Sequence, residues 1–261
     1  MMMPLRPSPH GRGWTRNAGP GEGKPQYGEY NRIRIISASL TSANALAHNR
    51  AMPSSSRKSV VLGVTGASGA IFARRMLQML EADACVGKIH LVISGSGLKV
   101  LREELQIDVA KSMEIPTLLA GGRTRKTVYL LDSDVGANIA SGSYRVDGMV
   151  VIPCTTGCLA QIGNGISSTL IERAADVCLK EGRKLILALR DTPFSRVHLE
   201  NMLRAQAAGA GIFPIIPAFY HRPQSIDDLV TQFCCRVLAH LGLEQAKQFR
   251  WSGGAELGNR K

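Results

Sequence analysis

The sequence has few aromatic residues and no long apolar run, and both shortages limit what the protein can be. Phe, Trp and Tyr make up 5% of the 261 residues, and no stripe of aromatics interleaved with bases occurs, so nucleic-acid binding is disfavoured. The longest uncharged stretch, residues 148–171, contains a proline, four glycines and seven polar side chains. We therefore expect no transmembrane helix and no membrane partner.

Paired cysteine motifs are absent, and acidic residues are fewer than basic ones. The six cysteines form no CxxC unit, so we expect reduced thiols in a cytoplasmic compartment and no metal site. The net charge is +12, but residues 1–57 carry eight Lys or Arg against two Glu, so half of the excess lies there. Elsewhere bases and acids are interspersed, which again indicates no nucleic-acid partner.

Composition divides the chain into a tail and a body. Residues 1–57 are rich in Pro, Gly, Ser, Asn and Arg, and we expect a disordered N-terminal extension. Two alternatives stay open, a mitochondrial transit peptide and a start codon placed too early, with Met52 as the real start. Residues 58–261 form the second predicted region, with one folded domain over residues 59–243.

Short β-branched runs alternate with helical periods in the body, which is typical of a parallel sheet with crossover helices. We therefore predict a single α/β domain with a doubly wound, Rossmann-like three-layer architecture. The expected strands are residues 59–65, 88–94, 127–131, 148–152, 184–189 and 211–215. The expected helices are residues 70–82, 97–105 and 170–180 and a last helix beginning at Ser225, with an irregular stretch before Lys126.

A glycine turn, Gly66–Gly69, follows the first strand. Such a turn directs backbone N–H groups and a helix dipole at an anion, although a turn without a ligand remains the alternative. Ala70 stands where a dinucleotide-binding pattern has its middle glycine, so a mononucleotide fits better. A second candidate, residues 153–158, follows the strand that ends at Ile152, and its small hydroxyl residues and glycine suit a flat polar ligand.

Several bases occupy positions suited to an anion. Arg173 and Lys180 are seven residues apart, so they share a helix face, and Arg190 directly follows a predicted strand. Solvated surface bases are the alternative. Tyr220 can donate to a phosphate or serve as a packing residue, and His221 lacks the partners of a general base.

Five motifs in this order resemble the flavin prenyltransferases of the UbiX family. The resemblance covers about residues 59–243 and rests on GVTGASGA, PCTTG, IERAADVCLKEGRKLILALRDTP, HLENM and PAFYHRPQSIDDLV. It implies a flavodoxin-like subunit that binds FMN, needs no metal and assembles into trimers and dodecamers. It also implies transfer of a dimethylallyl group from dimethylallyl phosphate to N5 and C6 of reduced FMN, giving the cofactor of UbiD-type decarboxylases, which act in ubiquinone biosynthesis or aromatic acid breakdown.

The resemblance assigns roles residue by residue. The implied FMN ligands are Gly66, Ala67, Ser68, Ser94, Thr155, Thr156, Gly157, Cys158 and Arg190. The implied ligands of the allylic phosphate are Arg173, Lys180, Tyr220 and Arg236. The implied catalytic residues are Ser68, Glu104, Lys180 and Asp191, with Glu104 reaching in from a neighbouring subunit. Asp191 stands where the family usually has Glu, and Thr155 and Cys158 replace the more usual Ser and Thr.

Two other functions stay open at this point. An FMN-dependent cysteine decarboxylase has a related fold, but its PASANT-like and PxMN segments are missing here. A non-catalytic FMN-binding protein would not need the four bases and the tyrosine beyond those that hold one flavin phosphate. The choice between a monophosphate and a pyrophosphate donor is also open.

Overall fold

The structure, a computed structural model, describes residues 57–110 and 112–251. The predicted extension, except for Arg57, lies outside the described residues. The fold belongs to the unit that spans Met52–Lys261.

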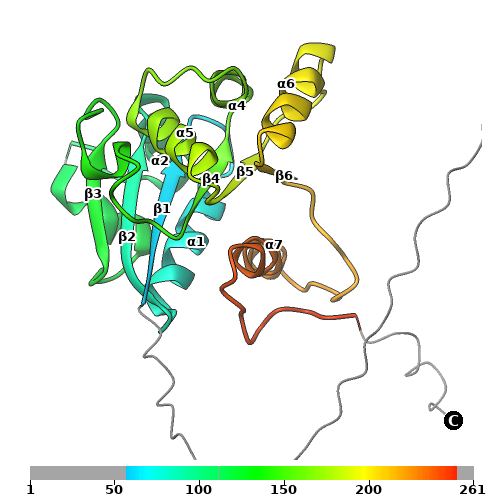
Figure 1. The fold of residues 1–261 in the computed structure, drawn as a ribbon. Coiled ribbons are helices and arrows are strands. Elements are labelled where there is room, and N and C mark those ends of the chain that lie inside the picture. Colours follow the sequence, from blue (N-terminus) through cyan, green and yellow to red (C-terminus); the bar gives the residue numbers. More distant parts are fainter. Residues whose placement is uncertain (1–56, 111, 252–261) are drawn as a thin grey trace, which may run out of the picture. The chain divides into compact units, whose positions relative to one another are not determined.

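Six parallel strands form one sheet in the order β3-β2-β1-β4-β5-β6 (Figure 1). The strands are β1 (Lys58–Val64), β2 (Val86–Ile93), β3 (Thr127–Leu131), β4 (Gly148–Cys154), β5 (Lys184–Leu189) and β6 (Gly211–Pro214). The chain proceeds outward in one direction through β2 and β3 and in the other through β4, β5 and β6. The strand order therefore reverses between β1 and β4, and ligands bind at such a switch point in open α/β sheets.

Helices cover both faces of the sheet. One face carries α1 (Ala70–Ala82), α2 (Gly95–Leu105), α3 (Ile115–Ala120) and α7 (Ile226–His240). The other carries α4 (Thr156–Gly163), α5 (Leu170–Lys180) and α6 (Arg196–Ala207). Two short 3-10 turns, Ser112–Glu114 and Asn138–Ala140, complete the described elements.

The central strands are buried on both faces, which explains their continuous apolar runs. Leu62 of β1 faces the core under α1, while its neighbour Val61 faces the core under α5. The structure thus confirms the doubly wound, flavodoxin-like α/β prediction. No described helix is long and apolar enough to cross a bilayer, and the uncharged stretch 148–171 forms β4, α4 and the start of α5.

The predicted elements agree with the structure, but three helices were missed. The strands 127–131 and 184–189 and the helices 70–82 and 170–180 have the predicted bounds. The helix α3 is only six residues long, and α4 begins within the glycine-containing PCTTG motif. In α6, Val197, Leu199 and Leu203 are exposed, so the helix lacks the single buried apolar stripe that periodicity detects.

Candidate functional site

Four of the predicted segments meet at one edge of the sheet. Residues 66–68 follow β1, Ser94 follows β2, residues 155–158 follow β4, and Arg190 follows β5. Because the strands are parallel and adjacent, these segments all lie at the carboxyl edge, on both sides of the switch point (Figure 1). The structure therefore brings together the residues expected to hold FMN.

Thr65 ties β1 to the start of α4. Its buried hydroxyl accepts a hydrogen bond from the amide of Thr155 at 2.8 Å and donates to the carbonyl of Pro153 at 2.9 Å. Thr155 is the N-cap of α4, and its hydroxyl accepts from the amide of Cys158 at 3.1 Å. The first turn of α4 is thereby fixed beside the glycine turn, with its N-terminal amides available to an anion.

Ser94 gives α2 a similar start on the other side of β1. Its hydroxyl accepts from the amide of Gly97 at 3.0 Å and lies 3.1 Å from the hydroxyl of Ser96. A Cβ atom added to Gly66 would lie 2.4 Å from Cβ of Ser96. Gly66 is therefore required by the close approach of the turn to α2, whereas Gly69 is required by its positive φ of 114°.

The carboxylate of Glu104 lies at the N-terminus of α1 of its own chain. It accepts hydrogen bonds from the amides of Gly69 at 2.9 and 3.1 Å and of Ala70 at 2.7 Å. This placement differs from the expectation that Glu104 reaches in from a neighbouring subunit. Because a carboxylate already satisfies these amides, the α2 and α4 termini are the better sites for a ligand phosphate.

Glu104 is held in its ionised form. Partial burial by itself raises the pKa, but hydrogen bonds from Ser68, Ala70 and Gly69 and the positive charge of Arg190 together bring the pKa of Glu104 below its usual value. Ser68, Glu104 and Arg190 therefore form one electrostatic group. The expected catalytic residues Ser68 and Glu104 are thus coupled, since Ser68 helps to lower the pKa of Glu104.

Arg190 and Asp191 extend this group toward α4. The backbone amide of Arg190 donates to the carbonyl of Cys154 at 3.2 Å, while its buried Nε has no partner among the described residues. Asp191 accepts from the hydroxyl of Thr156 at 3.2 Å and from the amide of Thr192 at 2.8 Å. A buried guanidinium nitrogen without a partner is expected where a bound anion completes the site.

The two cysteines of residues 153–158, Cys154 and Cys158, are buried thiols. Hydrogen bonding with Cys154 and burial raise the pKa of Cys158 well above its usual value. Cys158 is thus a neutral small side chain in the first turn of α4. Among the residues that the structure describes, no cluster of three or more metal-binding side chains occurs.

The residues expected to bind the allylic phosphate are not brought together within one chain. Arg173, in the first turn of α5, donates to the carbonyl of Ala140 at 3.3 Å and lies 3.7 Å from Asp176. Lys180 is exposed at the other end of α5, at the edge where β5 begins, opposite to Arg190. Tyr220 and Arg236 line a separate cavity of about 470 Å³.

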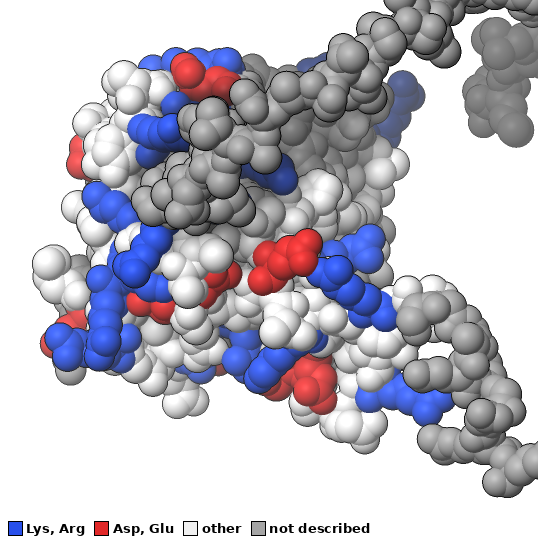
Figure 2. All heavy atoms as spheres, turned by 60° about the horizontal axis from the view of Figure 1, so that its bottom comes forward, with Lys and Arg blue, Asp and Glu red and all other residues white. Residues whose placement is uncertain are grey.

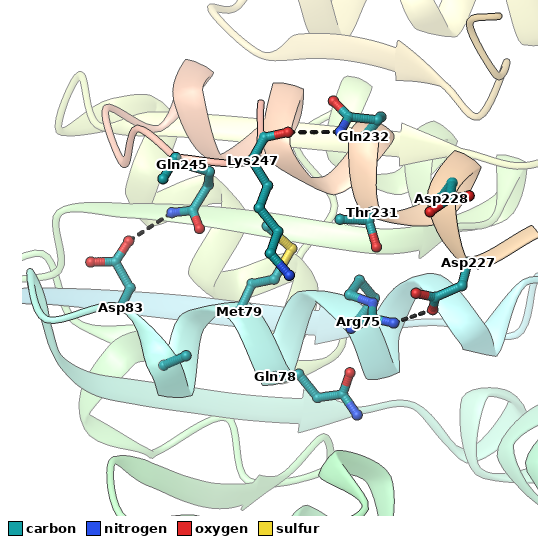
Figure 3. Close-up of a pocket in the computed structure, with 12 residues that line it drawn as sticks. Arg75, Gln78, Met79, Asp83, Asp227, Asp228, Thr231, Gln232, Gln245 and Lys247 are labelled. Atoms are coloured by element: carbon teal, nitrogen blue, oxygen red, sulfur yellow. Dashed lines mark hydrogen bonds and ion pairs between the residues drawn. The ribbon is translucent and has the colours of Figure 1, made fainter. Parts of the chain in front are cut away.

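A cavity of about 630 Å³ lies between α1, α7 and the segment after α7 (Figure 3). Arg75 pairs with Asp227 across it, and Asp83 accepts from the side chain of Gln245 at 2.8 Å. No predicted site residue lines this cavity, so it is separate from the carboxyl edge. On the face in Figure 2, basic and acidic groups lie interspersed rather than in a single basic stripe.

Thr65 and the segment after α7 are not among the predicted site residues. The apolar run predicts Thr65 only as the end of a strand, although a hydroxyl before the glycine turn is a signal for such a cross-link. Trp251 lies against Tyr220, with ring centroids 5.7 Å apart. No local pattern identified this contact, because it joins two loops that are remote in sequence.

The doubly wound sheet and the hydroxyl-capped helix termini at its switch point define an α/β protein of the mononucleotide-binding class. Residues 48–236 match the family model described as Flavoprotein. The chain is 43% identical over 191 residues to the flavin prenyltransferase UbiX of Halalkalibacterium halodurans, covering 73% of this chain and 91% of that protein. It is 41% identical to the mitochondrial flavin prenyltransferase PAD1 of Saccharomyces cerevisiae, covering 75% and 76%.

A solved structure is also similar. The crystal structure of AnUbiX (PadA1) in complex with FMN and dimethylallyl pyrophosphate has a TM-score of 0.67 and 38% identity, covering 76% of this chain and 98% of that one. The chain therefore belongs to the UbiX flavin prenyltransferases within the Flavoprotein family. This membership separates it from the cysteine decarboxylases considered above.

Proposed function

We propose that the protein is a metal-independent transferase that joins a dimethylallyl group from dimethylallyl phosphate to N5 and C6 of reduced FMN. Its relatives at about 40% identity are flavin prenyltransferases, and one similar structure holds FMN with dimethylallyl pyrophosphate. The observation that carries the proposal is the buried Nε of Arg190, which has no partner among the described residues and lies at the same edge of the sheet as the N-termini of α2 and α4.

FMN fits this edge of the sheet. We assign its contacts to the glycine turn, to the N-termini of α2 and α4, and to Arg190. The phosphate and flavin would be held by Gly66, Ala67, Ser68, Ser94, Thr155, Thr156, Gly157, Cys158 and Arg190. Bound reduced FMN supplies the nucleophilic atoms of the reaction, and the chain supplies binding, orientation and control of protons.

The allylic phosphate requires cations at the point where its C–O bond breaks. The bond's electrons leave with the phosphate, so donors and cations directed at this group stabilise the charge that develops in the transition state. We assign this role to Arg173, Lys180, Tyr220 and Arg236. Because a single chain does not gather these residues, we propose that a homo-oligomer, a trimer or a dodecamer, completes the site.

Assembly of this kind is recorded for a similar protein. The dodecameric FMN-dependent Ubix-like decarboxylase from Escherichia coli O157:H7 has a TM-score of 0.67 and 39% identity, covering 75% of this chain and all of that one. A test of the proposal is the molar mass of the full chain in solution, together with activity after the oligomer is diluted to subunits. Full activity of the separated subunit would contradict it.

Ser68, Glu104 and Asp191 are placed to hold or move protons. Ser68 helps to lower the pKa of Glu104, which accepts hydrogen bonds from the amides of Gly69 and Ala70. Asp191 is one methylene shorter than the family's usual Glu and is held by Thr156. We propose that Ser68 and Asp191 exchange protons with the substrates, while Glu104 orients Ser68 and the released phosphate accepts a proton.

The product would serve as the prenylated FMN cofactor of a UbiD-type decarboxylase, in ubiquinone biosynthesis or aromatic acid breakdown. A test is reconstitution of an apo-decarboxylase of this type with the reaction mixture. Decarboxylase activity that appears only when this protein, reduced FMN and the prenyl donor are all present supports the assignment. Activity that does not depend on the prenyl donor excludes it.

The reaction itself is tested by incubating the protein anaerobically with reduced FMN and either dimethylallyl phosphate or the pyrophosphate. The flavin is then released and weighed by mass spectrometry. Gain of one five-carbon unit supports the prenyltransferase, and the faster donor identifies the substrate. An unchanged flavin supports the non-catalytic alternative.

For location, we propose the cytoplasm, with mitochondria as the alternative if residues 1–57 are a cleaved transit peptide. All six cysteines lie within the described residues and are free thiols, as expected in a reducing compartment. One relative is named as mitochondrial. The mass of the N-terminal peptide of the native protein distinguishes the two locations.

A further inference from the structure

The cavity that contains Tyr220 and Arg236 is closed by the segment after α7. This C-terminal segment, residues 243–251, contributes part of the wall, and α7 and the loop after β6 contribute the rest. The lining residues are Ala218, Tyr220, Gln232, Arg236, Gln248, Phe249 and Trp251. Aromatic walls with one cation suit a small apolar group that carries an anion.

Apart from α7, the walls of this cavity are two irregular loops. Neither residues 215–225 nor residues 243–251 form a helix or strand, so side-chain contacts must determine their positions. The loops contact each other through Tyr220 and Trp251 and through His221 and Phe249, whose ring centroids lie 6.3 Å apart. These exposed ring contacts alone hold the segment weakly, because Tyr220 and Trp251 are 75% and 70% exposed.

Gln232 of α7 binds the backbone of the C-terminal segment twice. Its Nε2 donates to the carbonyl of Lys247 at 2.7 Å, and its Oε1 accepts from the amide of Phe249 at 2.8 Å (Figure 3 shows the first bond). One side-chain amide thus fixes the backbone on both sides of Gln248. The bond between Gln245 and Asp83 anchors the same segment nearer to α7's end.

We infer that Gln232 is a positioning residue that holds Phe249 and Trp251 over the site of the prenyl donor. This inference rests on the proposed function, which assigns Tyr220 and Arg236 to the allylic phosphate. Gln232 acts through the backbone bonds it makes, and a side chain that lacks them leaves the aromatic wall mobile. The prenyl donor then loses part of its binding site, while the FMN contacts at the carboxyl edge are unchanged.

The first test measures position without turnover. The sequence has two tryptophans, so a Trp14→Phe background leaves Trp251 as the sole indole. In the full chain, Gln232→Leu is expected to lower the fluorescence anisotropy of Trp251, because the indole is already exposed and what the variant changes is the mobility of the segment that carries it. The matched control is Gln78→Leu, which removes a 2.8 Å bond from a half-buried glutamine of α1 to the carbonyl of Ala120 and should leave the anisotropy unchanged. Equal anisotropy in the two variants overturns the positioning role.

The second test measures binding of each substrate. Loss of two hydrogen bonds is expected to raise the KM for dimethylallyl phosphate about tenfold in Gln232→Leu, with the KM for FMN unchanged. A structural defect alone would change both constants or neither, and that result overturns the inference. If the leucine variant does not fold, the same two KM values are measured for Gln232→Glu, which keeps the acceptor and loses the donor. The KM for dimethylallyl phosphate alone should then rise.

The two proposals fail in different ways. If the wild-type protein forms no prenylated flavin, the proposed function fails, and with it the assignment of this wall to the prenyl donor. If product forms but the fluorescence anisotropy of Trp251 in Gln232→Leu matches that in Gln78→Leu, only the role of Gln232 fails.

Discussion

Thr65 and Thr155 are joined by a hydrogen bond of 2.8 Å from the amide of Thr155 to the hydroxyl of Thr65. The two residues are 90 positions apart in sequence, and the bond fixes the N-cap of α4 beside the glycine turn. This cross-link holds the two segments that flank the switch point, both of which we propose to bind FMN, in one arrangement. The arrangement of the proposed FMN site therefore depends on a side chain that is not itself an expected FMN ligand.

Thr65→Val should weaken FMN binding. The variant keeps the size of the side chain but leaves the partly buried amide of Thr155 without its acceptor, at a cost of about 1–3 kcal/mol. We expect the Kd for FMN, measured by flavin fluorescence, to rise about tenfold. Thr127→Val removes a hydroxyl bonded to Glu81 at β3 and serves as the control, and equal Kd values for the two variants would refute this role.

Glu104→Gln should lower kcat more than it raises either KM. The amide keeps an acceptor for the amides of Gly69 and Ala70 but removes the charge that is coupled to Ser68 and Arg190. Effects of proton-transfer groups are typically about a hundredfold or more, and we expect a loss of about tenfold to a hundredfold for this indirect role. Glu103→Gln, which alters an exposed pair with Arg102, should leave kcat unchanged.

Gly66→Ala should destabilise the fold as well as the site. The added Cβ would lie 2.4 Å from Cβ of Ser96, so the turn or the start of α2 must move. Overpacking of this kind costs about 1–3 kcal/mol, and thermal unfolding should show a lower Tm. Gly122→Ala, whose added Cβ meets nothing within 4 Å, should unfold at the wild-type temperature. An unchanged Tm for Gly66→Ala would show that the close approach is not required.

His90 should make stability depend on pH below neutrality. Burial, with a smaller contribution from the charge of Lys88, lowers the pKa of His90 from 6.5 to about 4. The unfolded chain therefore binds more protons between pH 6.5 and 4, and stability falls as the pH falls through this window, by roughly 3 kcal/mol in all. Urea unfolding of wild type and His90→Asn at pH 7 and pH 4.5 measures the effect. A pH dependence that persists undiminished in His90→Asn would assign it to other groups.

Local sequence patterns were sufficient to predict most strands of the sheet, because buried parallel strands are continuous apolar runs, as in residues 184–189. They were insufficient for α6, whose apolar residues Val197 and Leu203 are exposed and follow no single stripe. In the site, Ser68 and Arg190 were predicted correctly to lie at the same edge, since both follow parallel strands. The contact between Glu104 and Gly69 depends on how α2 packs against the turn, which no local pattern encodes.

Local patterns were also insufficient to predict how the cations of the phosphate cluster are arranged in space. Arg173 and Lys180 share a face of α5 as their spacing predicted, but a seven-residue separation also places them at opposite ends of a helix of 11 residues. Helical spacing defines direction around an axis and says nothing about which neighbouring element faces each end. We therefore propose that residues from more than one chain form the predicted phosphate cluster.

The mass of the flavin after one anaerobic reaction cycle shows directly whether this protein prenylates FMN. Protein is mixed with reduced FMN and an excess of dimethylallyl phosphate, and the bound flavin is released with acid and weighed. We predict a flavin heavier than FMN by one five-carbon unit, and loss of this product when Arg190 is replaced by Met. Recovery of unmodified FMN alone, from protein shown to bind both compounds, would contradict it.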